Sequence, residues 1–151
     1  MATRSTFIYS AAAIRRLMGL PNSVPVQIRE FLNVVWVWVK GDRPTFVSKA
    51  KLKRHFVERR QAEAQTLEVT DWLQTPARYT VTNLQSGSRH IVTEHADRLA
   101  CDCEDFHWQQ RFLGRGCCKH GYAVLNHLGF DSLSSFAAAK ATGSSPLTPM
   151  S

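Results

Sequence analysis

All four cysteines of the chain fall within residues 101 to 120, together with two of its six histidines. Zinc needs about four sulfur or nitrogen ligands in a tetrahedron, and short ligand pairs close a chain around it most readily. Cys101 and Cys103 supply one such pair, and Cys118 and His120 supply the other. The spacing predicts a four-ligand Zn²⁺ site, which constrains the fold more than any other feature of the sequence.

Two other interpretations of the cysteines are less favoured. Disulfides would require the adjacent Cys117 and Cys118 to bridge back to Cys101 and Cys103 in an oxidising compartment, which no secretory signal indicates. A catalytic thiol beside His120 would need an oriented base, and none is evident. Four protein ligands would fill the coordination sphere of the zinc, whereas a catalytic zinc keeps an open position. We therefore expect a structural zinc site and no enzymatic activity.

The sequence around these ligands resembles the SWIM zinc finger over about residues 77–129. The resemblance rests on Cys-x-Cys, a spacer and Cys-Lys-His, preceded by the hairpin RYTVTN and RHIVTEH. An acidic and aromatic stretch, EDF, follows the first pair, and a helix, CKHGYAVLNHL, begins at the second. The resemblance implies the same four ligands. It also implies DNA binding or protein interaction, as in transposases, chromatin enzymes and recombination accessories.

Three residues near the ligands fall outside this pattern. The pattern has one residue between its last two ligands, so Cys117 has no place in it and is expected to be a small buried side chain. His107 and His127 are alternative ligands by their proximity in sequence, but both break the pattern. We expect these histidines to be structural or exposed.

The charge of the chain is concentrated in its first half. Residues 1–60 carry twelve Lys or Arg and three Asp or Glu, a balance of +9, whereas residues 61–151 carry seven and nine, a balance of −2. Such asymmetry predicts an anionic partner, and nucleic acid is favoured because neutralised phosphates release condensed counterions. The alternative is a basic surface that serves only solubility.

The first half contains signals for several short elements. Ser10 and Gly19 bound a predicted helix, and VPVQIREFLN (residues 24–33) predicts a second one. VVWVWVK and TFVSK predict a hairpin over residues 34–48, and a basic helix follows Ser48. Alternation places Trp36 and Trp38 on the opposite face from Val35, Val37 and Val39. The tryptophans either stack on bases or, as we favour, cap the hydrophobic core.

The order helix, turn, helix, hairpin, helix resembles the winged helix-turn-helix of excisionase and MerR-type DNA-binding domains. The resemblance covers about residues 8–60 and is carried by YSAAAIRRLMGL, VQIREFLN and the wing KGDRPTFVSK. It implies that the second helix and the wing contact DNA. The candidate nucleic-acid contacts are Arg15, Arg16, Gln27, Arg29, Lys40, Arg43, Lys49, Lys51, Lys53 and Arg54.

The second half is predicted to consist of the hairpin, a third strand in RLACDC and two helices, in GYAVLNHLGF and DSLSSFAAAK. Residues 61–76 predict a fading helix and a connector. We thus expect an α+β protein with a winged-helix-like domain over 1–68, a SWIM-like zinc domain over 69–139 and a disordered tail over 140–151.

The predicted function is that of a non-catalytic zinc-binding protein that binds nucleic acid, with DNA favoured over RNA, through its basic N-terminal domain and a structural zinc finger. The alternative is an adaptor or accessory subunit of a larger nucleoprotein or mobile-element complex. We expect no membrane association and no small-molecule substrate. The expected location is intracellular: cytoplasmic in a prokaryote and otherwise nuclear.

Overall fold

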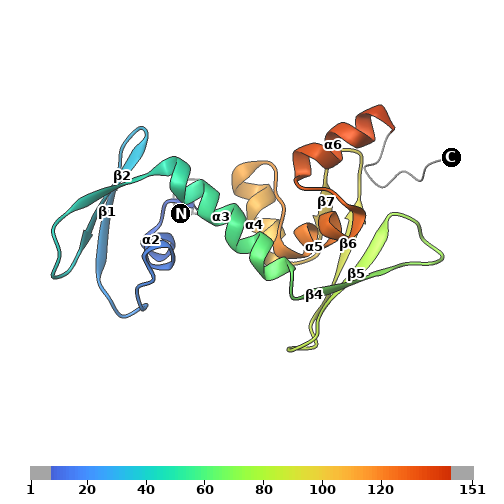
Figure 1. The fold of residues 1–151 in the computed structure, drawn as a ribbon, viewed down its shortest axis with the longest axis horizontal. Helices are drawn as coiled ribbons and strands as arrows, with labels where there is room; N and C mark the ends of the chain where they lie inside the picture. The colour runs from blue at the N-terminus through green and yellow to red at the C-terminus, as the bar shows by residue number, and fades with distance from the viewer. Residues whose placement is uncertain (1–7, 144–151) are drawn as a thin grey trace. The chain divides into compact units, whose positions relative to one another are not determined.

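The computed structural model describes residues 8–143 and contains helices and two small antiparallel sheets (Figure 1). The chain divides into two compact units, Met1–Arg59 and Arg60–Ser151. This division falls earlier than the boundary expected after residue 68. The reason is that residues 60–68 hold the end of a long helix and the start of the first strand of the second sheet.

Within the described residues, the first unit contains a short helix, a three-stranded sheet and most of a longer helix. Ser10 caps the short helix by accepting a hydrogen bond from the Ala13 backbone N–H at 3.0 Å, and Gly19 ends it with a φ of 68°. Both ends are therefore where the sequence predicts them. The elements in chain order are α2 (Ala11–Met18), β1 (Val26–Glu30), β2 (Val34–Val39), β3 (Thr45–Ser48) and α3 (Lys49–Ala64).

The predicted second helix is wrong, because residues 26–30 form strand β1 instead. Val26 and Ile28 are half-buried and alternate with exposed Gln27 and Arg29, which is the period of a strand. All five residues pair with β2 in antiparallel register. The predicted hairpin is confirmed as β2 and β3, and β1 extends it to a sheet of order β1-β2-β3. The helix-turn-helix is absent from the described residues, so the winged-helix resemblance is not confirmed.

The two faces of this sheet differ in burial. Val35, Val37 and Val39 are at most 5% exposed, and the buried residues of α2 and α3 in this unit, such as Ile14 and Leu52, complete its interior. The tryptophans of β2 are half-buried and lie on the other face. The favoured interpretation, in which they cap the core, is therefore wrong.

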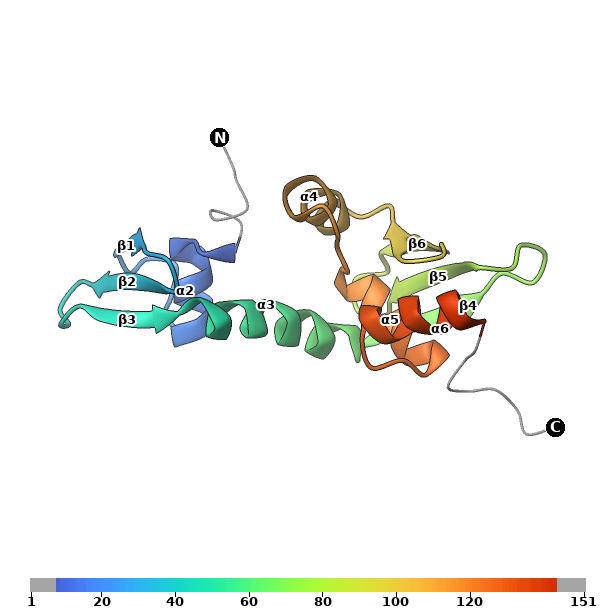
Figure 2. The same ribbon diagram turned by 90° about the horizontal axis from the view of Figure 1, so that it is seen from above.

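The described elements after α3 are β4 (Leu67–Asp71), β5 (Arg78–Asn83), β6 (Arg89–Glu94), β7 (Leu99–Cys101), α4 (Glu104–Leu113), α5 (Lys119–Leu128) and α6 (Leu133–Thr142). The four strands form an antiparallel sheet of order β4-β5-β6-β7 (Figure 1). Helices α4, α5 and α6 follow the sheet in the chain (Figure 2). The predicted hairpin, third strand and last two helices are confirmed. Strand β4 replaces part of the expected connector, and α4 occupies the spacer between the cysteine pairs.

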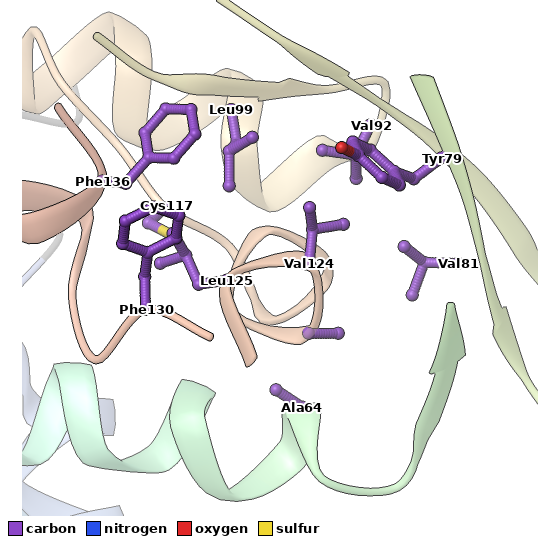
Figure 3. Packing of buried hydrophobic residues seen from close by; sticks show 11 residues of the cluster. Ala64, Tyr79, Val81, Val92, Leu99, Cys117, Val124, Leu125, Phe130 and Phe136 are labelled. Carbon is purple, nitrogen blue, oxygen red and sulfur yellow. The ribbon is translucent and has the colours of Figure 1, made fainter. Parts of the chain in front are cut away.

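The core of the second unit lies between its sheet and helix α5, which contacts all four strands. Val124 of α5 lies near Val81 and Val92 of the sheet (Figure 3). The rings of Phe130 and Phe136 meet edge to face at 5.5 Å and close one end of this core. Burying such side chains stabilises the fold by about 1.5–3 kcal/mol each. The interior therefore holds α5, and with it half of the candidate metal ligands, against the sheet.

Residues 140–142 of the expected tail form the end of α6, and residues 144–151 lie outside the described residues. Within residues 8–143, no helix has the length and apolar character needed to cross a membrane.

Candidate metal centre

The four predicted ligands come from the ends of three elements in the second unit. Cys101 is the last residue of β7, and Cys103 is the N-cap of α4. Cys118 is the N-cap of α5, and His120 lies in its first turn. Strand β7 pairs with β6, and α5 is packed on the sheet, so both ligand pairs are attached to the same core.

The ligand atoms lie close enough together to share one metal ion. All four lie within 4.8 Å of one another. His120 directs Nδ1 towards the cluster, at 3.7 Å from the Sγ atoms of both Cys101 and Cys118. With Zn–S bonds of about 2.3 Å and Zn–N bonds of about 2.1 Å, a tetrahedron places sulfur and nitrogen roughly 3.6 Å apart. The donor set and its dimensions therefore fit Zn²⁺.

The first turns of two helices favour negative charge on two of the sulfurs. The Phe106 backbone N–H donates to Cys103 Sγ at 3.3 Å, and the Gly121 N–H donates to Cys118 Sγ at 3.4 Å. Backbone N–H groups at a helix N-terminus stabilise a thiolate through hydrogen bonding and the helix dipole. The peptide groups thereby support the deprotonated form that binds metal.

The crowding of three thiols makes a cation necessary for all of them to ionise. Hydrogen bonding to Cys103 raises the pKa of Cys101 above its usual range, and the same contact lowers the pKa of Cys103. One thiolate is thus stabilised by the protons of its neighbours. Three thiolates and a neutral imidazole carry −3, and Zn²⁺ reduces this to −1, so metal binding and deprotonation are coupled.

A buried glutamine supports the backbone that leads into the second ligand pair. The Gln109 side chain accepts a hydrogen bond from the Cys117 N–H at 3.0 Å and donates one to the Cys117 carbonyl at 3.2 Å. Gln109 also donates to Asp105 Oδ2 at 2.9 Å, and Arg60 holds Asp105 with two hydrogen bonds of 2.8 and 2.9 Å. This network fixes the peptide immediately before Cys118.

Two glycines permit this close packing. A Cβ added to Gly116 would lie 2.5 Å from Gln109 Cβ, and one added to Gly121 would lie 2.9 Å from Cys117 Sγ. The first distance is too short for any side chain without movement of α4 or of the loop. The absence of side chains at residues 116 and 121 is therefore part of how the ligand loop is positioned.

The residues expected to lie outside the site do so. Cys117 belongs to the hydrophobic core, and burial raises the pKa of its thiol well above the usual value. His107 is exposed on α4 and contacts the ring of Trp108. His127 is exposed on α5, with Nε2 2.8 Å from Asp71 Oδ1. Each of these three residues therefore makes its contacts outside the cluster of four ligand atoms.

One neighbour of the site was not predicted from the sequence. The ring centroid of His90 lies 4.3 Å from that of His120, and His90 Nδ1 lies 2.9 Å from Asp102 Oδ1. His90 also forms a compact group with Asp102 and Cys101. This arrangement orients His90 against the ligand imidazole. The feature of the sequence that could have placed His90 near the ligands was the predicted pairing of β6 and β7, which brings the start of β6 beside the cysteines.

The candidate nucleic-acid contacts fall into two groups in the structure. Arg15 and Lys49 have partners within the first unit. Arg15 Nε donates to the Val24 carbonyl at 2.9 Å, and Lys49 Nζ lies 2.6 Å from a Glu30 carboxylate oxygen and 4.9 Å from the Tyr9 ring centre. The remaining candidates are exposed, and they are Arg16, Gln27, Arg29, Lys40, Arg43, Lys51, Lys53 and Arg54.

Residues 81–129 match the family model of the SWIM zinc finger, and this range includes all four ligands. The chain therefore carries a SWIM zinc finger with a Cys₃His cluster suited to Zn²⁺. No curated protein and no solved structure matches the chain.

Proposed function

We propose that this chain is a non-catalytic zinc protein that binds nucleic acid, DNA in preference to RNA, through its basic first unit. The observation that carries the proposal is charge. Residues 1–59 contain eleven Lys or Arg and three Asp or Glu, a balance of +8. Lys49 is neutralised by Glu30, whereas Lys51, Lys53 and Arg54 on the same helix are exposed. Clustered like charges repel one another unless a polyanion neutralises them.

The zinc finger has a structural role in this proposal. Three cysteines and one histidine occupy all positions of a tetrahedral zinc, and thiolates make the metal a poor Lewis acid. Three of the four ligands are at most 6% exposed. Zinc binding then stabilises a small module that presents a second surface for DNA or for a protein.

The test is the affinity of the whole protein for duplex DNA, single-stranded DNA and RNA, measured by fluorescence anisotropy across a salt series. Direct phosphate contact predicts an affinity that falls steeply as salt increases. Replacing Lys51, Lys53 and Arg54 together with Glu is expected to weaken binding to all sequences similarly. It should also reduce the log–log salt slope by up to about three.

The matched control replaces Arg89, Arg98 and Arg115 with Glu. These three residues are exposed in the second unit, and the change in net charge is the same. Equal losses in the two triple variants would show that net charge, and not the α3 surface, determines binding. No binding of the wild-type protein to any nucleic acid at about 50 mM salt would refute the proposal.

An adaptor role is the second candidate, because the second unit exposes large apolar side chains. Leu73 is 96% exposed and Leu84 is 66% exposed, and both lie in turns between strands. The two turns lie at opposite ends of β5, and Leu73 is adjacent to Trp72, which is 37% exposed. Adjacent exposed apolar side chains of this kind mark candidate protein interaction sites. Purification of the native complex, with Leu73→Ser and Leu84→Ser as variants, would test this role.

A further inference from the structure

We propose that the outer face of the β1-β2-β3 sheet binds single-stranded nucleic acid by stacking unpaired bases on its aromatic side chains. The inference rests on the proposed function and adds to it the form of nucleic acid and the surface that holds it. The outer face is defined by Gln27, Arg29, Trp36, Trp38 and Phe46, and it is the face opposite Val35, Val37 and Val39.

Strand register places these residues in two rows across the sheet. Arg29 of β1 is paired with Trp36 of β2, which is paired in turn with Phe46 of β3. Gln27 and Trp38 form the neighbouring row. Residues that are paired across antiparallel strands lie on the same face with their side chains adjacent. One row thus combines a guanidinium group with two aromatic rings.

Trp36 and Trp38 of this face are half-buried, whereas two phenylalanine rings at its edge are exposed. Phe46 is 61% exposed, and Phe31, in the turn after β1, is 47% exposed. Their rings meet edge to face with centroids 6.3 Å apart. A hollow of about 430 Å³ lies beside them, and its lining includes Phe31, Trp36, Gln27 and Arg29. We expect a flat ligand, such as a base, to contact the exposed rings beside this hollow.

Charge and hydrogen-bonding capacity favour nucleic acid as the occupant. Arg29 is the only charged residue among the paired residues of the outer face, and no acidic residue is among them. The turn after β2 exposes Lys40, Asp42 and Arg43 and so adds a net charge of +1. A guanidinium group and an amide can hydrogen-bond to base edges and phosphates, and aromatic rings stack on bases of any sequence. A base in a duplex is already paired and stacked, so this face favours single strands.

The test compares Phe46→Thr with Phe46→Tyr. Both replacements suit a strand, but only tyrosine keeps a ring. The probes are single-stranded DNA and RNA of the same sequence and the matching DNA duplex. We expect Phe46→Thr to weaken single-strand binding by roughly 5- to 150-fold, the effect of losing one stacked base, while duplex affinity stays unchanged. Phe46→Tyr should retain wild-type affinity.

A second variant lies outside the strands, in the turn between β1 and β2. Phe31→Ala is expected to weaken single-strand binding, whereas its neighbour Leu32→Ala, a change at a side chain that is 87% exposed, should not. Photo-cross-linking of 5-iodouracil oligonucleotides, followed by peptide mapping, should place the cross-link within residues 27–46. Comparing the DNA and RNA arms identifies which single strand is preferred.

The outcomes separate this inference from the proposed function. Salt-dependent binding that is unchanged in Phe46→Thr and Phe31→Ala would overturn base stacking and leave nucleic-acid binding intact. Equal losses on duplex and single strand would also overturn it. No binding to any probe would refute both. Capture of a protein that depends on Phe46, with no nucleic acid bound, would identify the face as a protein-docking surface and overturn the inference.

Discussion

Replacing Gln109 with leucine should weaken zinc binding although Gln109 is not a ligand. Its side chain is 3% exposed and holds both backbone groups of Cys117, the residue before the ligand Cys118. Leucine is similar in size and cannot form hydrogen bonds, so the replacement leaves the Cys117 N–H and carbonyl buried without these partners. Asp105 keeps its two hydrogen bonds from Arg60.

The expected loss of stability follows from the Cys117 N–H and carbonyl, which no longer have the hydrogen bonds with Gln109. Each buried polar group left without a partner costs about 1–3 kcal/mol, so the free energy of unfolding of the variant should fall by about 2–6 kcal/mol. Zinc binding and folding of the module are coupled, so this loss appears in the apparent zinc affinity. Taking about 3 kcal/mol as representative, the dissociation constant for zinc rises by roughly 100-fold.

The measurement is a zinc competition titration against a chromogenic chelator, together with thermal unfolding at saturating zinc. The control is Gln110→Leu on the same helix. Among the described residues, Gln110 Oε1 is buried and accepts no hydrogen bond, and its amide donates only to the Gly114 carbonyl at 3.4 Å. The control should change stability by about 1 kcal/mol or less. A Gln109→Leu protein that binds zinc and melts like the wild type would refute the proposed support by Gln109.

Three further predictions concern the same unit. Cys118→Ser should abolish stoichiometric zinc binding in elemental analysis while Cys117→Ser retains it, and equal zinc content in the two variants would contradict the ligand assignment. Gly116→Ala should lower the free energy of unfolding by about 1–3 kcal/mol in urea titrations, because the new Cβ would lie 2.5 Å from Gln109 Cβ; an unchanged unfolding midpoint would show that the loop relaxes freely. Burial, and then the charges of nearby carboxylates, raise the pKa of Tyr79 from 10.0 to about 12. The folded state therefore holds the phenol proton more tightly, and stability should fall as pH rises from 10 towards 12; Tyr79→Phe should remove part of this fall, and an identical pH profile would contradict it.

The sequence by itself determined the metal ligands and two of the three elements that carry them, β7 and α5, but not α4. Cys101, Cys103, Cys118 and His120 were predicted as one site, and the structure brings their ligand atoms together. This was possible because zinc imposes a fixed number and type of ligands, and because the ligands lie in short pairs. The hairpin before the site and the helix after it were also predictable, since alternation and capping are local signals.

Only the tertiary structure decided which segments joined the sheets. The segment 24–33 has apolar side chains at helical spacing, as in Val24, Ile28 and Leu32. Val26 and Ile28 alternate as in a strand, and pairing with β2 selected the strand. Strand β4 was missed for the same reason, because a strand is stabilised by its partners more than by its own sequence. Burial of Gln109 beside Cys117 and the contact between the rings of His90 and His120 depend on contacts between separate elements.

The difference between local sequence signals and tertiary packing also explains the position of the two tryptophans of β2. Alternation in the sequence placed Trp36 and Trp38 on one face and the valines on the other, but it could not say which face would be buried. Helix α2 packs against β1, and the valine face is the buried one, so the tryptophans line the outer face. Local periodicity thus determines which residues share a face, whereas packing of the other elements decides which face meets the solvent.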